Sequence, residues 1–156
     1  MAQHAPSPFA ELEGLELGFQ YLSGRDRQGV NMLVISAAGV FPKGSAGNDH
    51  GKALAAYTLQ GLVYFDPVVL ILDFSGLHYT WGNSLLQVYQ AAHQWLEAET
   101  EPEEPLHPLL TILGPHCEAA WRSLVTPVGK EPPPYFTSLE KAETEGIRLG
   151  SAWLDF

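Results

Sequence analysis

Side chains that could bind a ligand or a partner are concentrated in residues 72–85. In this segment a run of apolar residues ends at an acid, and a helical pattern follows. The segment carries Tyr79 and Trp81, then a glycine, and then Asn83 and Ser84. Ligands and partners of α/β proteins favour this place, outside the carboxyl ends of strands and at helix N-termini with free backbone N–H groups. The two aromatic side chains can also simply pack the edge of the sheet, because aromatic residues serve both cores and interfaces.

Residues 44–52 resemble a phosphate-binding loop but lack two residues that such a loop needs. Ala46 stands where the first glycine belongs, and Ala53 stands where a hydroxyl group would hold magnesium. The six histidines include no pair four residues apart, which is the helical spacing that aims two imidazoles at one ion. We therefore predict a surface loop over residues 44–52, no metal site and no cofactor.

Cys117 is the single cysteine, so no disulfide within the chain is possible. It lies at the predicted start of a helix, where the macrodipole lowers the pKa of a thiol and can activate a nucleophile. Its spacing with Ala120 and Trp121 places it on an apolar helix face, which favours a buried structural cysteine. The chain also has no Gly-x-Ser-x-Gly elbow for an active-site serine. We predict no catalytic residues.

The hydrophobic periodicity predicts the elements that position these residues. Alternating residues over 15–21 and an apolar run over 30–38 flank a turn and predict an N-terminal β-hairpin. The run over 68–72 has no polar residue, which is typical of a strand buried on both faces of a sheet. A further strand is predicted over 109–113, and helices over 52–65, over 84–96 with Asn83 as its N-cap, over 115–125, and from the Thr137–Glu140 capping box onward.

This order predicts one α/β (α+β) domain over residues 1–156, a small mixed β-sheet covered by about four helices. Residues 1–10 are expected to form a mobile tail, and residues 97–108 an acidic loop rich in proline and glutamate.

The charge of the chain excludes some classes of partner. Its 18 acidic and 8 basic residues give a net charge of -10, which repels nucleic acid and anionic membrane surfaces. A basic protein partner is compatible with this charge, and Glu101, Glu103 and Glu104 lie in the most acidic stretch. The first residues have neither a basic region nor an apolar signal core, so we expect a cytoplasmic protein with no membrane partner.

The segment after the buried strand resembles the STAS family, small domains related to anti-sigma-factor antagonists and to cytoplasmic domains of sulfate transporters. That family's segment is an apolar strand, Asp, a turn of the type Leu-Ser-Gly-Val, an aromatic residue, and Asp-Ser-Ser-Gly-Leu opening a helix. Residues 69–77 and Tyr79 match its first part, and the order of the later elements is similar over about residues 30–146. The resemblance implies a STAS-like fold and a regulatory role in binding proteins.

The second part of the segment departs from the family. The family's acid falls on Trp81, and its phosphoacceptor serine falls on Asn83, which cannot be phosphorylated. The neighbouring Ser84 is the residue here that could take a phosphate in its place. Asn83 can still offer its amide to a partner.

Residues 79–85 also resemble the crotonase signature Phe-x-x-Gly-x-Asp-Leu, with residues 53–72 as that fold's first helix and strand. This resemblance implies an oxyanion hole of backbone N–H groups near the glycine and a reaction on acyl thioesters. The chain is much shorter than a complete crotonase, the acid of the signature falls on Ser84, and no later glutamate is assigned as the base.

We therefore predict a non-enzymatic module that binds and inhibits or regulates a basic protein, either an immunity protein (antitoxin) that neutralises a toxin domain or a STAS-type antagonist. The alternative is a crotonase-like enzyme or an inactive relative of one. The predicted partner-binding residues are Tyr79, Trp81, Asn83, Ser84, Glu101, Glu103 and Glu104.

Overall fold

A computed structural model describes residues 14–126 and 128–156 of the chain. The predicted tail over residues 1–10 therefore lies outside the described residues.

The chain opens with the predicted β-hairpin. Strand β1 (Leu15–Leu22) pairs antiparallel with β2 (Met32–Val40), in a register that runs from Leu15 opposite Gly39 to Leu22 opposite Met32. A 3-10 turn, η2 (Gly24–Asp26), connects them. The second strand begins two residues later than predicted, because Val30 still belongs to the turn and its N–H donates to the Arg27 carbonyl at 3.0 Å.

The remaining strands add to β2 in parallel. The sheet has the order β1-β2-β3-β5, with β3 (Val69–Phe74) beside β2 and β5 (Leu109–Leu113) beside β3. The short strand β4 (Leu77–His78) pairs with the end of β2. Residues 69–72 are buried on both faces, as their unbroken apolar run predicts.

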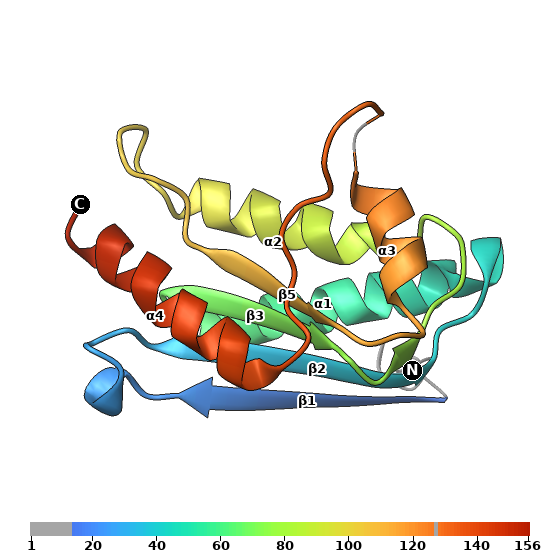
Figure 1. Ribbon diagram of the computed structural model, residues 1–156, viewed down its shortest axis with the longest axis horizontal. Helices are drawn as coiled ribbons and strands as arrows, with labels where there is room; N and C mark the ends of the chain where they lie inside the picture. The colour runs from blue at the N-terminus through green and yellow to red at the C-terminus, as the bar shows by residue number, and fades with distance from the viewer. Residues whose placement is uncertain (1–13, 127) are drawn as a thin grey trace, which may run out of the picture.

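Helices cover both faces of this sheet (Figure 1). Helices α1 (Asn48–Phe65), α2 (Leu86–Ala98) and α3 (Glu118–Val125) enclose the larger core, which contains Trp121, Phe74 and Leu54. Helix α4 (Leu139–Leu154) covers the other face and closes a smaller core around Met32, with Ala142 fully buried. The four α-helices and mixed sheet of the described residues confirm the predicted fold class.

Helix α1 begins four residues earlier than predicted, at Asn48, and follows a 3-10 turn, η3 (Gly44–Gly47). The glycines of this stretch predicted a loop. Gly51 nevertheless lies inside the helix. The position requires glycine because a Cβ there would collide with the Ser84 carbonyl oxygen. Its role is to let α1 and the start of α2 approach closely.

The predicted N-cap Asn83 is wrong. Helix α2 begins at Leu86, and neither Asn83 nor the N-cap residue Leu85 makes a side-chain capping bond. The chain enters α2 instead through backbone turns. In these turns the N–H of Leu86 donates to the Asn83 carbonyl at 3.0 Å, and the N–H of Gln87 donates to the Ser84 carbonyl at 3.2 Å.

The last two helices also begin later than predicted. Helix α3 starts at Glu118, after a turn at residues 115–117, and its predicted inward residues Cys117 and Trp121 are buried. Helix α4 starts at Leu139 because Ser138, and not Thr137, accepts a hydrogen bond from the backbone N–H of Lys141.

Candidate functional site

A groove lies between residues 78–83 and helix α3, where the parallel strands β3, β4 and β5 end. It consists of two adjoining hollows of about 290 and 230 Å³ that share Thr80 and Ala120. We call it the 78–83 groove. Its second wall is made by Pro115, His116, Ala119, Ala120, Ser123 and Leu124.

Trp81 stands at this groove on a rigid backbone support. The N–H of Gly44 donates to the Trp81 carbonyl at 3.2 Å, and the indole packs so closely on Gly44 that a Cβ there would lie 2.5 Å from the ring. Gly44 and Gly82 have φ angles of +56° and +120°, a region that favours glycine. The Trp81 residue is nevertheless 60% exposed. It is therefore a large aromatic group that is fixed and still accessible.

Tyr79 and Ser84 are buried, which corrects their prediction as surface residues. Tyr79 is 1% exposed, its hydroxyl donates to the Gly82 carbonyl, and its ring packs edge-on against Phe41. Burial raises the pKa of this phenol. Ser84 is 3% exposed, and its Oγ donates to Asn48 Oδ1 at 2.8 Å. Ser84 therefore holds the 79–85 segment to the start of α1, and Tyr79 packs it against Phe41.

The burial of Ser84 bears on the predicted phosphorylation. A phosphate on its Oγ would have to replace the bond to Asn48 and bring about two negative charges into a closed contact. Phosphorylation at this residue therefore requires the 79–85 segment to open. Asn83, by contrast, is exposed and lines the groove beside Trp81.

The second wall of the groove was not predicted from the sequence. His116 stacks on His78 with ring centroids 4.2 Å apart, which joins the two walls of the groove. Ser123 adds a hydroxyl group on the α3 side. Nothing in the local pattern of residues 115–124 indicates that they face residues 78–83, because the contact arises only from the fold.

Cys117 lies at the base of α3 and is 1% exposed. Burial raises the pKa of its thiol to about 12, so the favourable helix terminus does not yield a thiolate at neutral pH. The structure supports the prediction that Cys117 is a buried structural cysteine.

A buried polar chain fixes helix α3 to the rest of the molecule. Trp121 Nε1 donates to the Tyr89 hydroxyl at 2.7 Å, and that hydroxyl lies 2.9 Å from Thr111 Oγ1. Burial raises the pKa of Tyr89. The chain joins α3, α2 and β5, so the α3 wall of the groove is held by satisfied polar contacts as well as by apolar packing.

The acidic residues Glu101, Glu103 and Glu104 are exposed and follow the C-terminal end of α2, whereas Trp81 precedes its start. Figure 1 shows the segments before and after α2 at opposite ends of this helix. Helix α2 has 13 residues, which corresponds to about 20 Å. These glutamates are therefore not neighbours of Trp81, and their part in binding a partner stays a prediction. They line a separate hollow with the end of α4.

Within residues 14–126 and 128–156, no group of three or more His, Cys, Asp or Glu side chains is placed to hold a metal ion. No helix in this part of the chain combines the length and the apolar character needed to cross a membrane.

The crotonase alternative finds limited support in the groove. Its lining includes the imidazoles of His78 and His116 and the polar groups of Thr80, Asn83 and Ser123. Among the described residues that line it there is no carboxylate to act as a base. A reaction on acyl thioesters stays a prediction that the geometry does not favour.

No protein-family model matches the chain, and a search of curated proteins found no relative. Among solved structures, the crystal structure of an anti-sigma factor antagonist from Mycobacterium paratuberculosis is similar to this chain. The alignment covers 94% of this chain and 99% of that chain, with a TM-score of 0.46 and 13% sequence identity.

Proposed function

We propose that this protein is a non-enzymatic regulatory module that binds a partner protein through the 78–83 groove. One observation carries the proposal: Trp81 is 60% exposed although its backbone is fixed against Gly44. Tryptophan is enriched among the few residues that carry most of the binding energy of protein interfaces. Asn83 beside it supplies an amide that can donate and accept hydrogen bonds.

The energetics favour Trp81 as the main contact. A tryptophan side chain can bury up to about 250 Å², so covering the exposed part contributes roughly 2–4 kcal/mol of transfer free energy. Because the supporting backbone is already ordered, little further conformational entropy is lost on binding. A partner that fills the groove also covers Thr80 and Ser123, whose hydroxyl groups can form hydrogen bonds that fix the position of the partner.

The proposed consequence of binding is regulation by covering the partner's own functional surface. The net charge of -10 suits a basic partner and accelerates its encounter. Two versions fit this description in the cytoplasm, an immunity protein that neutralises a toxin domain and a STAS-type antagonist. They differ in the class of the partner, which is a toxin in the first and a signalling protein in the second.

Affinity capture from the native cell, followed by calorimetry with the purified partner, tests the proposal. We expect Trp81→Ala to weaken partner binding at least about tenfold, in line with the loss of an interface anchor. Tyr64→Ala is the matched control, because Tyr64 is an aromatic residue that is 80% exposed on α1. Equal affinities of the two variants and the wild type would contradict the proposed surface, and tight binding of coenzyme A would favour the enzyme alternative.

A further inference from the structure

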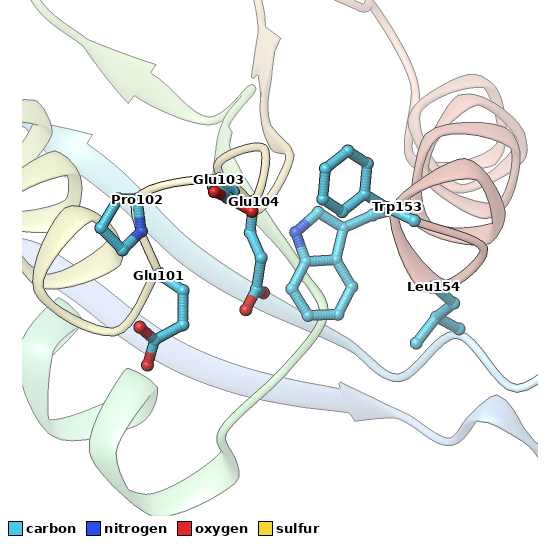
Figure 2. Close-up of a pocket in the computed structure, with 7 residues that line it drawn as sticks. Glu101, Pro102, Glu103, Glu104, Trp153 and Leu154 are labelled. Carbon is cyan, nitrogen blue, oxygen red and sulfur yellow. The ribbon is translucent and has the colours of Figure 1, made fainter.

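The end of α4 and the acidic loop form a hollow of about 580 Å³. Residues 101–104 make one side, and Trp153, Leu154 and Phe156 make the other. Leu154 and Phe156 are 45% and 72% exposed, so the second side is an apolar surface open to solvent. We call this feature the acidic hollow. Figure 2 shows the Glu104 side chain extended alongside the Trp153 indole.

The Trp153 side chain is held in place before any ligand arrives. Its Nε1 donates to the Pro105 carbonyl at 2.9 Å, and its ring lies against His107 with centroids 4.2 Å apart. His107 is itself fixed, because its Nδ1 donates to the Val68 carbonyl at 3.1 Å. The indole therefore forms a preorganised wall, and the acidic loop is tied to α4 through it.

The charge of the hollow is uncompensated. Glu101, Glu103 and Glu104 are exposed, and none of them lies within ion-pair distance of another residue in the described part of the chain. Arg148, on the same helix as Trp153, already pairs with Glu145. An apolar wall that faces several unpaired carboxylates is complementary to a group that is cationic and has apolar or planar surface.

We propose that the acidic hollow docks a cationic segment of the partner protein, with an arginine side chain inserted between the glutamates and Trp153. A guanidinium group satisfies both sides at once, since its planar face stacks on an indole while its edge donates to carboxylates. The net charge of -10 disfavours a second copy of this chain as the occupant. The inference rests on the proposed protein-binding function and adds the chemistry of the partner.

A short fluorescein-labelled peptide with the repeat Arg-Leu-Ser is the probe. We expect it to bind the full chain, as measured by fluorescence anisotropy, and to shift the Trp153 indole N–H resonance while leaving that of Trp81 in place. Peptides with glutamate in place of arginine, or glycine in place of leucine, are expected to bind at least about tenfold more weakly, because each lacks one half of the complementarity.

Two variants locate the site. Trp153→Ala and the triple change Glu101→Gln, Glu103→Gln, Glu104→Gln are each expected to weaken peptide binding about tenfold, and the triple change also to reduce its salt dependence. The matched control is the triple change Asp26→Asn, Glu131→Gln, Glu140→Gln, which alters the net charge equally at exposed positions elsewhere. Circular dichroism and thermal unfolding confirm that each variant is folded.

The inference is overturned if the control triple weakens binding as much as the hollow triple, because net charge alone then explains the affinity. It is also overturned if the peptide shifts the Trp81 resonance instead of that of Trp153. If sedimentation shows dimers that Trp153→Ala disrupts, the occupant is a second copy and the inference is wrong. The peptide assay does not depend on Trp81, so its failure is separate from a failure of the 78–83 groove.

Discussion

The two ends of helix α2 present surfaces that are built in different ways. At its start, the 79–85 segment is fixed by backbone contacts to residues 44–51, so glycines and buried hydroxyl groups determine the shape of the surface. At its end, the acidic loop is shaped by one aromatic side chain, Trp153, and by unpaired carboxylates. The comparison teaches that substitutions of the buried contacts at the first end act through stability, while substitutions of the glutamates at the second end act through charge.

The largest effect is expected where a side chain is forced between α1 and α2. Gly51→Leu should lower the free energy of unfolding by about 3 kcal/mol, because its Cβ would collide with the Ser84 carbonyl. Lys52→Leu, at the next and exposed position of α1, should change it by less than about 0.5 kcal/mol. Urea unfolding measures both. Equal stabilities would show that this end is not held by close backbone packing.

The buried polar chain behind the groove is expected to give the next largest effect. Tyr89→Phe removes the acceptor of the Trp121 indole and the partner of Thr111, and should cost about 1–3 kcal/mol of unfolding free energy. Tyr64→Phe is the control, because Tyr64 is 80% exposed. If the two variants unfold at the same urea concentration, the chain does not hold α3 in place.

Alkaline pH should lower the free energy of unfolding through ionisation of the Cys117 thiol at the base of α3. The folded pKa of the thiol, about 12, lies above its ordinary value of 9.0. Between pH 9 and 12 the unfolded thiol loses its proton while the folded thiol keeps it. The contribution of this group to the free energy of unfolding is therefore fully present below pH 9 and falls as the pH rises toward 12. The slope from this group is at most about 1.4 kcal/mol per pH unit. Urea unfolding of Cys117→Ala should show a smaller decline over this range than the wild type, and an unchanged decline would contradict the assignment.

The smallest effect on stability is expected at the acidic hollow. Glu103→Gln should change the free energy of unfolding by less than about 0.5 kcal/mol, since its carboxylate is exposed and has no ion-pair partner among the described residues. The same change should slow association with a basic partner at low salt, as stopped-flow fluorescence can measure. A loss of more than 1 kcal/mol, on the order of an anchoring contact, would show that this loop is structural after all.

The fold was largely predictable because local patterns encode strand and helix periods. The hairpin, the buried strand β3 and the limits of β5 follow from alternation and from unbroken apolar runs. The segment after β3 also drew attention to Trp81. The starts of α1 and α2 were misplaced, because tertiary packing between Gly51 and Ser84 overrides the usual meaning of glycine and asparagine.

The site itself was predictable only in part. Tyr79 and Ser84 have types common at interfaces, and their burial depends on Phe41 and Asn48, which lie far away in the sequence. The α3 wall of the groove depends on contacts across almost 40 residues, which no local pattern contains. Charge counting drew attention to the glutamates but could not show that Trp153, some 50 residues later, is their neighbour.

Hydrogen–deuterium exchange of the chain, alone and with its captured partner, tests the proposed function most directly. Binding through the 78–83 groove predicts slower exchange in peptides that cover residues 78–83 and α3, with no change in β1. Protection confined to β1, or unchanged exchange around Trp81 in a saturated complex, would contradict it.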